Sequence, residues 1–177
     1  MSEDLLRYPI GHPAQKPELS DAERTQAIAI IDACPARMRQ ALSGLSQEQL
    51  DTPYRPGGWT LRQVAHHVPD SHINAYVRFK LALTEDEPTI KPYDEARWAE
   101  LHDTRTTPVE VSLVLLETLH RRWVDLLHTL RPEDFRRALK HPDKGRLTLD
   151  QMLDLYAWHG SHHVAHVTSL RERMGWR

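Results

Sequence analysis

The sequence of 177 residues predicts an all-α protein, a four-helix bundle with long connecting loops. Four segments begin with the pattern S/T-x-x-E/Q, the capping box, in which two side chains satisfy free N–H groups at a helix start. Behind each box, apolar residues recur at spacings of three and four, which is the period of one helix face. Gly and Pro lie between these segments, apart from Pro35, Pro69 and Gly160. No segment has the alternation that is typical of a strand.

The first predicted helix follows the box Ser20–Glu23, and its apolar face holds Ala27, Ile31, Cys34, Met38 and Ala41. Pro35 lies inside this helix and lacks the N–H of the helical hydrogen bond, so we expect a kink or a break there. Residues 1–19 are expected to form an extended N-terminal arm, because RYPIGHPAQKP is too rich in Pro to be helical. The length favours one domain that covers residues 1–177.

The other three helices follow the boxes Thr60–Gln63, Thr107–Glu110 and Thr148–Gln151. In the third box Pro108 is expected at the first helical position, where its missing N–H costs nothing. The apolar faces hold Leu61, Val64, Val68, Ala75, Phe79 and Ala82, then Leu113, Leu116, Trp123, Leu126, Leu127 and Leu130, then Leu149, Met152, Tyr156, Val167 and Leu170. Between the last two helices, PEDFRRAL predicts a short helical turn and KHPDKGR a loop.

Composition excludes several classes of protein. The formal net charge is −2 and there is no run of Lys and Arg, so nucleic acid is not expected as a partner. No apolar run is long enough to span a bilayer, and MSEDLLRYPIG does not resemble a signal peptide. The single cysteine, Cys34, excludes an internal disulfide and a CxxC zinc site. We therefore expect a cytoplasmic protein away from membranes, and nitrogen and oxygen ligands for any metal.

The stretch YAWHGSHHVAHV places four histidines within eight residues of the fourth helix. At about 100° per residue, His163 falls roughly 25° and His159 roughly 65° from the centre of the apolar face. His166 is marginal at roughly 85°, and His162 points outside. The inward pair is spaced i,i+4, which lets two imidazoles reach one ion. The alternative is that both are interior histidines bonded to carbonyls or carboxylates.

The second helix offers a further ligand. His67 lies on the flank of its apolar face, His66 faces nearly opposite, and His72 on the apolar side is a rival. One histidine from this helix and the pair on the fourth would give three nitrogen ligands with an open position, which is typical of catalytic zinc sites. Bundle cores often hold such sites between facing helices.

Other side chains carry weaker signals. Carboxylates that could orient an imidazole, and polar residues that could line a pocket, are Asp70, Asp154, Glu117, Asn74, Tyr76 and Arg78. Four tryptophans are expected in the core or packed against loops, namely Trp59, Trp98, Trp123 and Trp158. Cys34 fits a small buried apolar residue better than a reactive thiol. His12 and His141 lie in loops, where no spacing argument applies.

Three stretches of the chain resemble the DinB/YfiT-like family: RYPIG, the long segment from GGWTLRQVAHHV to DEARWAEL, and LYAWHGSHHVAHV. The likeness covers nearly the whole chain. It implies an up-down-down-up bundle, a homodimer, and one divalent metal per subunit, zinc first and nickel second, bound by three histidines. The histidine eight positions after Trp59 is His67, and the first and fifth residues of HGSHH are His159 and His163. Pro69, where relatives usually have Ala, departs from the pattern and predicts a kink in the second helix.

The resemblance implies a metal-dependent hydrolase that acts on a small molecule through an activated water. A second possibility is an S-transferase that conjugates a low-molecular-weight thiol, such as bacillithiol or mycothiol, to electrophiles, and a pocket-facing Arg78 would favour an acidic thiol. No Glu is placed as in HExxH to act as general base, which weakens the hydrolase case without removing it. From another class, the chain could be a non-catalytic metal-binding or structural bundle. The sequence leaves all three open.

Overall fold

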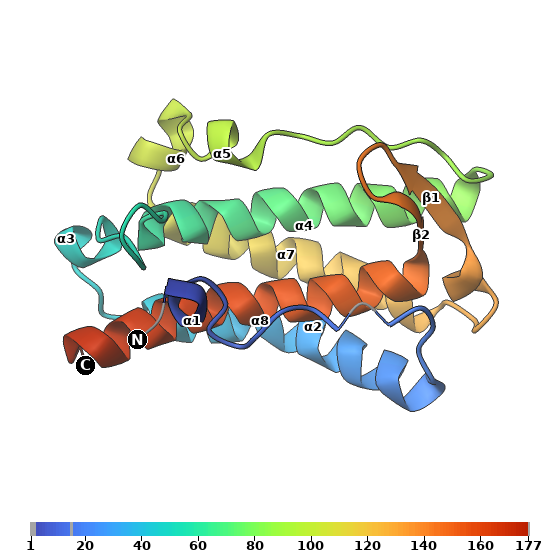
Figure 1. Ribbon diagram of the computed structural model, residues 1–177, viewed down its shortest axis with the longest axis horizontal. Coiled ribbons are helices and arrows are strands. Elements are labelled where there is room, and N and C mark those ends of the chain that lie inside the picture. Colours follow the sequence, from blue (N-terminus) through green and yellow to red (C-terminus); the bar gives the residue numbers. More distant parts are fainter. Residues whose placement is uncertain (1–2, 15, 177) are drawn as a thin grey trace.

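The computed structural model describes residues 3–14 and 16–176, and over this range four long helices form a bundle (Figure 1). They are α2 (Asp21–Leu42), α4 (Leu61–Thr84), α7 (Val109–His128) and α8 (Leu149–Met174). The colours of Figure 1 show that α2 and α8 run in one direction and α4 and α7 in the other. Each of α2 and α4 packs against both α7 and α8. The expected up-down-down-up bundle is therefore confirmed.

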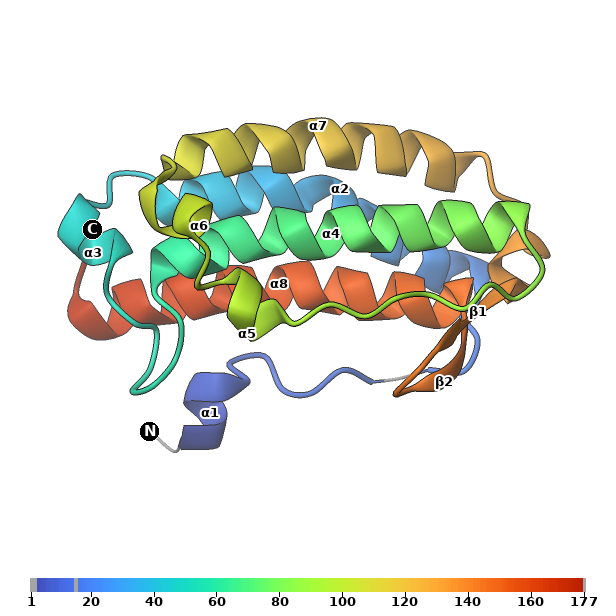
Figure 2. The ribbon, with the colours of Figure 1, turned by 90° about the horizontal axis from the view of Figure 1, so that it is seen from above.

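Parallel neighbours require a long connection. Because α4 and α7 run the same way, the chain between them returns along the length of the bundle and lies beside α4 (Figures 1 and 2). This crossover contains the short helices α5 (Glu95–Trp98) and α6 (His102–Thr106), which both contact α4. The connection from α2 to α4 contains α3 (Gln47–Leu50). The long loop expected before the third helix thus allows α4 and α7 to run in the same direction.

Three of the four capping boxes form as expected, at Ser20, Thr60 and Thr148. The third was wrong. Pro108 is the N-cap of α7, its ψ of 136° is extended, and α7 begins only at Val109 with no side-chain cap bond. Thr107 instead ends α6 as its C-cap residue. The third box does not form because its first residue, Thr107, belongs to the end of α6, a short helix that the sequence pattern did not predict.

The expected loop KHPDKGR is instead an antiparallel hairpin. Strands β1 (Ala138–His141) and β2 (Gly145–Thr148) pair in the register Ala138 to Thr148, and Gly145 follows the turn with a φ of +74°. The short helical turn before it is confirmed as the 3₁₀-helix η1 (Asp134–Arg136). Four-residue strands are too short to show alternation, and the crossover at Thr89 also bridges to β1 at Lys140. The conformation of this segment therefore depends on tertiary pairing rather than on its local sequence pattern.

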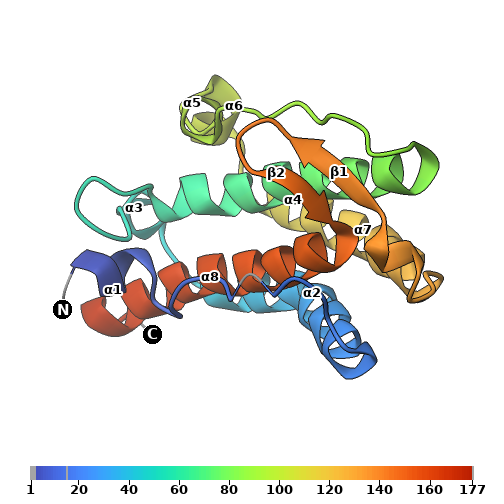
Figure 3. The same cartoon turned by 45° about the vertical axis from the view of Figure 1, so that its right-hand side comes forward.

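The N-terminal arm is not extended throughout. Its residues Glu3–Arg7 form helix α1, whereas the described residues 8–14 and 16–19 contain no helix. Positions 1–2 and 15 of the expected arm lie outside the described residues. The arm passes along α8, as Figures 1 and 3 show. The prediction that the arm is not helical is confirmed for the described residues 8–14 and 16–19, but it was wrong for Glu3–Arg7.

The two helical prolines do not break their helices. Helix α2 continues through Pro35, so the break that was expected there as an alternative to a kink does not occur. Helix α4 likewise continues through Pro69. A proline leaves the carbonyl four residues earlier without its helical N–H partner. At Pro35 this is the carbonyl of Ile31, and it accepts a hydrogen bond from Nδ1 of His120 at 2.6 Å. The missing backbone bond is replaced by a side chain of α7.

The apolar core forms two clusters along the bundle axis. One contains Phe79, Trp123 and their neighbours, and the other contains Met38, Leu116 and theirs. On α4, α7 and α8 the sequence between the two clusters contributes a layer in which polar residues are buried, including His72 and His120. The histidine layer thus lies midway along the bundle.

Among the described residues no helix has both the length and the apolar character needed to cross a bilayer.

Candidate metal centre

Three histidines from two helices converge near this layer. His67 comes from α4, and His159 and His163 come from successive turns of α8. One ring nitrogen from each lies within 4.8 Å of the others, and Nε2 of His67 is 3.3 Å from Nε2 of His159. The structure brings together the three residues that the sequence singled out.

The donor set fits a divalent metal ion. In a tetrahedral site with Zn–N bonds of about 2.0–2.1 Å, neighbouring ligand nitrogens are about 3.3 Å apart, close to the His67–His159 spacing. Burial lowers the pKa of His67 to about 4 and the pKa values of His159 and His163 well below their usual value. Neutral imidazoles offer the lone pair that metal binding needs. A cation between the rings could accept one lone pair from each of the three imidazoles.

Other histidines, rather than carboxylates, stand behind the two α8 imidazoles. Nδ1 of His159 is 3.1 Å from Nε2 of His72, and Nδ1 of His163 is 3.3 Å from Nδ1 of His166. The acids suggested for this role lie elsewhere. Within the described residues Glu117 pairs with arginines, and no hydrogen bond joins Asp70 or Asp154 to the three rings.

The cluster opens into a cavity of about 810 Å³. Its wall includes Trp59, whose ring centre is 4.6 Å from that of His67, and the phenols of Tyr93 and Tyr156. Burial raises the pKa of both phenols, so at neutral pH they remain O–H groups. The guanidinium of Arg78 lines the same space. The cavity therefore presents phenols and charged side chains of both signs beside three imidazoles.

Two histidines that were weighed against His67 take other roles. His66 is buried away from the cluster, with Nδ1 2.7 Å from Ser112 Oγ and Nε2 3.1 Å from the Thr107 carbonyl. His72, the rival, is fully buried between His159 and His120, outside the group of three. His67 is thus the α4 member of the cluster.

The expectation that His162 points outside was wrong. His162 is 6% exposed, and its ring stacks on Trp158 at 4.3 Å and packs against Tyr8 at 5.7 Å. His166, expected at the margin, is 3% exposed and contacts the Arg7 carbonyl. The N-terminal arm covers this side of α8. A helical wheel that considers only the bundle interior does not include that cover.

Some residues around the site have no recognisable pattern in the sequence, whereas His120 has a clear one. His12 and His141 reach the cavity wall from the arm and the hairpin, where helical spacing gives no guidance. His120 lies four residues after Leu116 and three before Trp123, so it shares the apolar face of α7. That spacing predicts a buried histidine, and His120 is 1% exposed.

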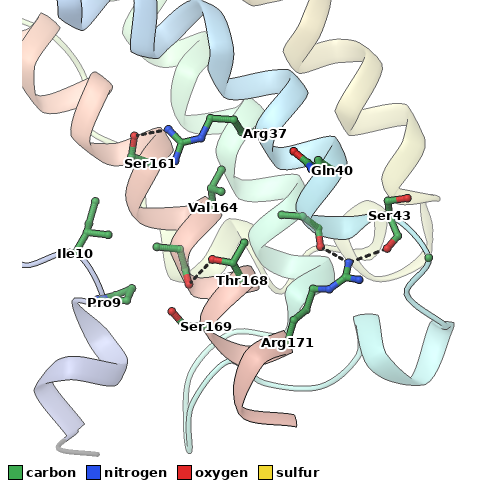
Figure 4. A pocket seen from close by; sticks show the side chains of 13 residues that line it. Pro9, Ile10, Arg37, Gln40, Ser43, Ser161, Val164, Thr168, Ser169 and Arg171 are labelled. Atoms are coloured by element: carbon green, nitrogen blue, oxygen red, sulfur yellow. Dashed lines mark hydrogen bonds between the residues drawn. The ribbon is translucent and has the colours of Figure 1, made fainter. Parts of the chain in front are cut away.

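A larger hollow, of about 1080 Å³, lies between α2, α8 and the arm (Figure 4). It holds two arginines as its titratable side chains. Arg171 donates to the carbonyls of Ala41 and Ser43, and Arg37 donates to Ser161 Oγ at 3.4 Å. The described residues of its wall include no imidazole or carboxylate, and therefore offer no group suited to acid–base chemistry. The smaller cavity at the histidines is the candidate site.

Fold and site together define a helical bundle with a three-histidine centre between α4 and α8. The chain belongs to the DinB superfamily, whose model matches residues 30–167. It is 55% identical over 171 residues to a Bacillus cereus (strain AH820) protein named "Putative metal-dependent hydrolase", covering 97% of this chain and 98% of that one. It is also similar to YfiT from Bacillus subtilis, described as "a probable metal-dependent hydrolase with an unusual four-helix bundle topology", with a TM-score of 0.95, 49% identity and coverage of 98% and 99%. The four-helix bundle protein TT2238, with a TM-score of 0.57 and 20% identity over 80% of this chain and 94% of that one, shares the fold.

Proposed function

We propose that this protein is a metal-dependent hydrolase in which His67, His159 and His163 hold one divalent ion. The observation that carries the proposal is the convergence of three ring nitrogens within 4.8 Å beside a cavity. The names of the similar Bacillus proteins support it. When bound, such an ion supplies Lewis acidity and lowers the pKa of water to about 7, and three protein ligands leave a position open for that water or a substrate.

The residues of the cavity suit a small substrate with a carbonyl or an acidic group. Tyr93 and Tyr156 can donate O–H hydrogen bonds to an oxygen that gains negative charge. Arg78 can bind a carboxylate or phosphate through a bidentate pair of hydrogen bonds. The volume lies in the range of about 300–1,000 Å³ that is common for small-molecule sites. The chain itself would therefore bind and orient the substrate.

For the ion, we propose zinc first and nickel second, because three imidazoles suit both. We further propose a homodimer. Support comes from α7, which lies along one edge of the bundle in Figure 2 and exposes Val111, Val114 and Leu115 on one face. Sedimentation equilibrium tests this, and a monomer at high concentration would contradict it.

A second candidate is a metal-dependent S-transferase that takes an acidic low-molecular-weight thiol of the bacillithiol type. The observation that favours it is the presence of Arg78 and Lys144 in the cavity wall, where two cations can pair with carboxylates of such a thiol. The cavity also holds Glu95 and Asp143, so its charge alone does not select this chemistry.

Turnover assays separate the candidates. Protein loaded with zinc, and separately with nickel, is offered ester and amide substrates, and then electrophiles with bacillithiol or mycothiol. Metal-dependent cleavage without thiol, lost in His163→Ala and kept in the exposed-site control His128→Ala, is the expected result. Turnover that requires the thiol identifies the transferase. Stoichiometric metal without turnover in either assay indicates a non-catalytic bundle.

A further inference from the structure

Behind the two α8 ligands lie buried histidines that the proposed reaction does not use. We propose that two chains of histidines, each ending on a backbone carbonyl, hold His159 and His163 in the Nδ1–H tautomer with Nε2 facing the metal site. His72, His120 and His166 would then be positioning residues. The inference rests on the proposed function only for the identity of the metal site, since the tautomers follow from hydrogen bonds within the protein itself.

The first chain begins at the carbonyl of Ile31, which can only accept a hydrogen bond. His120 Nδ1 lies 2.6 Å from it and therefore carries a proton. In a neutral ring His120 Nε2 is then an acceptor, and its partner at 2.7 Å, His72 Nδ1, must be an N–H. His72 Nε2 in turn accepts from His159 Nδ1 at 3.1 Å. The lone pair of His159 is left on Nε2, the atom that faces His67.

The rings of this chain are neutral. His72 is 0% exposed and His120 is 1% exposed, and they lie in the layer between the two apolar clusters. A second proton on either ring would place two N–H groups head to head. Burial also lowers the pKa of His120 to about 4. One arrangement of protons therefore satisfies every hydrogen bond of the first histidine chain.

The second chain is shorter and reaches the other ligand. The carbonyl of Arg7 accepts from His166 Nε2 at 2.9 Å, so this nitrogen carries the proton. His166 Nδ1 is then an acceptor for His163 Nδ1–H at 3.3 Å. The lone pair of His163 is left on Nε2. Both α8 ligands thus have the same tautomer, although the partner of His159 lies on α4 and the partner of His163 lies on α8 itself.

Both terminal carbonyls are groups that the local backbone leaves free. Ile31 lacks its helical partner because Pro35 has no N–H. Arg7 is the last residue of α1, where carbonyls have no partner within the helix. Each anchor is therefore available to a side chain without the loss of a backbone hydrogen bond. The helical proline and the short N-terminal helix acquire a role at the site.

The tautomers can be measured on metal-free protein that contains ¹⁵N-labelled histidine. Long-range ¹H–¹⁵N correlation spectra distinguish Nδ1–H from Nε2–H rings, and single His→Gln variants assign the signals. We expect Nδ1–H at His159, His163, His72 and His120, and Nε2–H at His166. An Nε2–H ring at His159 or His163 would overturn the inference. This measurement needs neither metal nor activity.

Metal affinity tests the consequence. Loss of a partner behind a metal-bound histidine typically costs about 10–100-fold in affinity, so we expect zinc Kd values to rise by about this factor in His120→Phe and in His166→Phe. His128→Phe, at an exposed position of the same helix as His120, should leave the Kd unchanged. Unchanged affinity in both folded variants would refute the positioning role. If wild type shows the expected tautomers but binds no metal, the proposed function fails and the histidine chains stand.

Discussion

Gly160 gives a sharp test of how α8 packs against α2 beside the site. Its neighbour His159 is a proposed ligand, and a Cβ added at Gly160 would lie 2.7 Å from Cys34 Sγ and 3.4 Å from Cys34 Cβ. Inside an exposed helix, Gly→Ala would stabilise by about 1 kcal/mol. Here the added methyl must displace a buried sulfur, and overpacking of this kind costs about 1–3 kcal/mol. We expect Gly160→Ala to destabilise by up to about 2 kcal/mol.

The same substitution should change sign when the sulfur is removed. In a Cys34→Ala background the nearest remaining side-chain atom of residue 34 is Cβ at 3.4 Å, which is an ordinary contact. Only the helix-propensity gain of about 1 kcal/mol then remains. Urea unfolding of the wild type, the two single variants and the double variant gives the coupling, expected at about 1–3 kcal/mol. Equal stabilisation by Gly160→Ala in both backgrounds would refute the close approach of the helices.

Three further results are expected from buried groups. Asp150→Ala removes the carboxylate that accepts two 2.7 Å bonds from buried Arg24 and should cost about 3–5 kcal/mol in urea unfolding, whereas Asp21→Ala, 82% exposed, should cost less than about 1 kcal/mol. Because burial lowers the pKa of His120 from 6.5 to about 4, the unfolded chain binds protons in this interval that the folded chain does not, so stability is full above pH 6.5 and falls towards pH 4. His120 alone contributes about 3 kcal/mol to that fall, and a flat profile for the metal-free protein would contradict the burial of neutral histidines. The thiol of Cys34, 2% exposed and with its pKa raised to about 12, should react with a disulfide reagent at pH 8 only after unfolding, and rapid reaction of folded protein would count against its position.

Much of the architecture could be predicted because its determinants are local. The boxes at Ser20, Thr60 and Thr148 and the apolar spacing behind them specify three helix starts. The i,i+4 spacing of His159 and His163 specifies a shared helix face, and the family resemblance added His67. These features depend on residues within one or two helical turns, which is the range over which a sequence pattern operates.

The features that the sequence did not predict depend on contacts between distant segments. His162 is buried because the arm lies over α8, and the hairpin forms because its strands pair with each other and the crossover bridges to one of them. The link from Pro35 through the Ile31 carbonyl to His120 joins two helices far apart in sequence. The apolar spacing around His120 predicts its burial, but not its partner. For His120, only the three-dimensional structure identifies the hydrogen-bond partner.

The central claim is that His67, His159 and His163 form one metal site, and calorimetric titration of metal-free protein with zinc tests it most directly. The expected result is one equivalent bound per chain, lost in His67→Ala, His159→Ala and His163→Ala and retained in His128→Ala, whose histidine is exposed. Absence of stoichiometric binding by the wild type, or binding that is unchanged in all three variants, would contradict the claim.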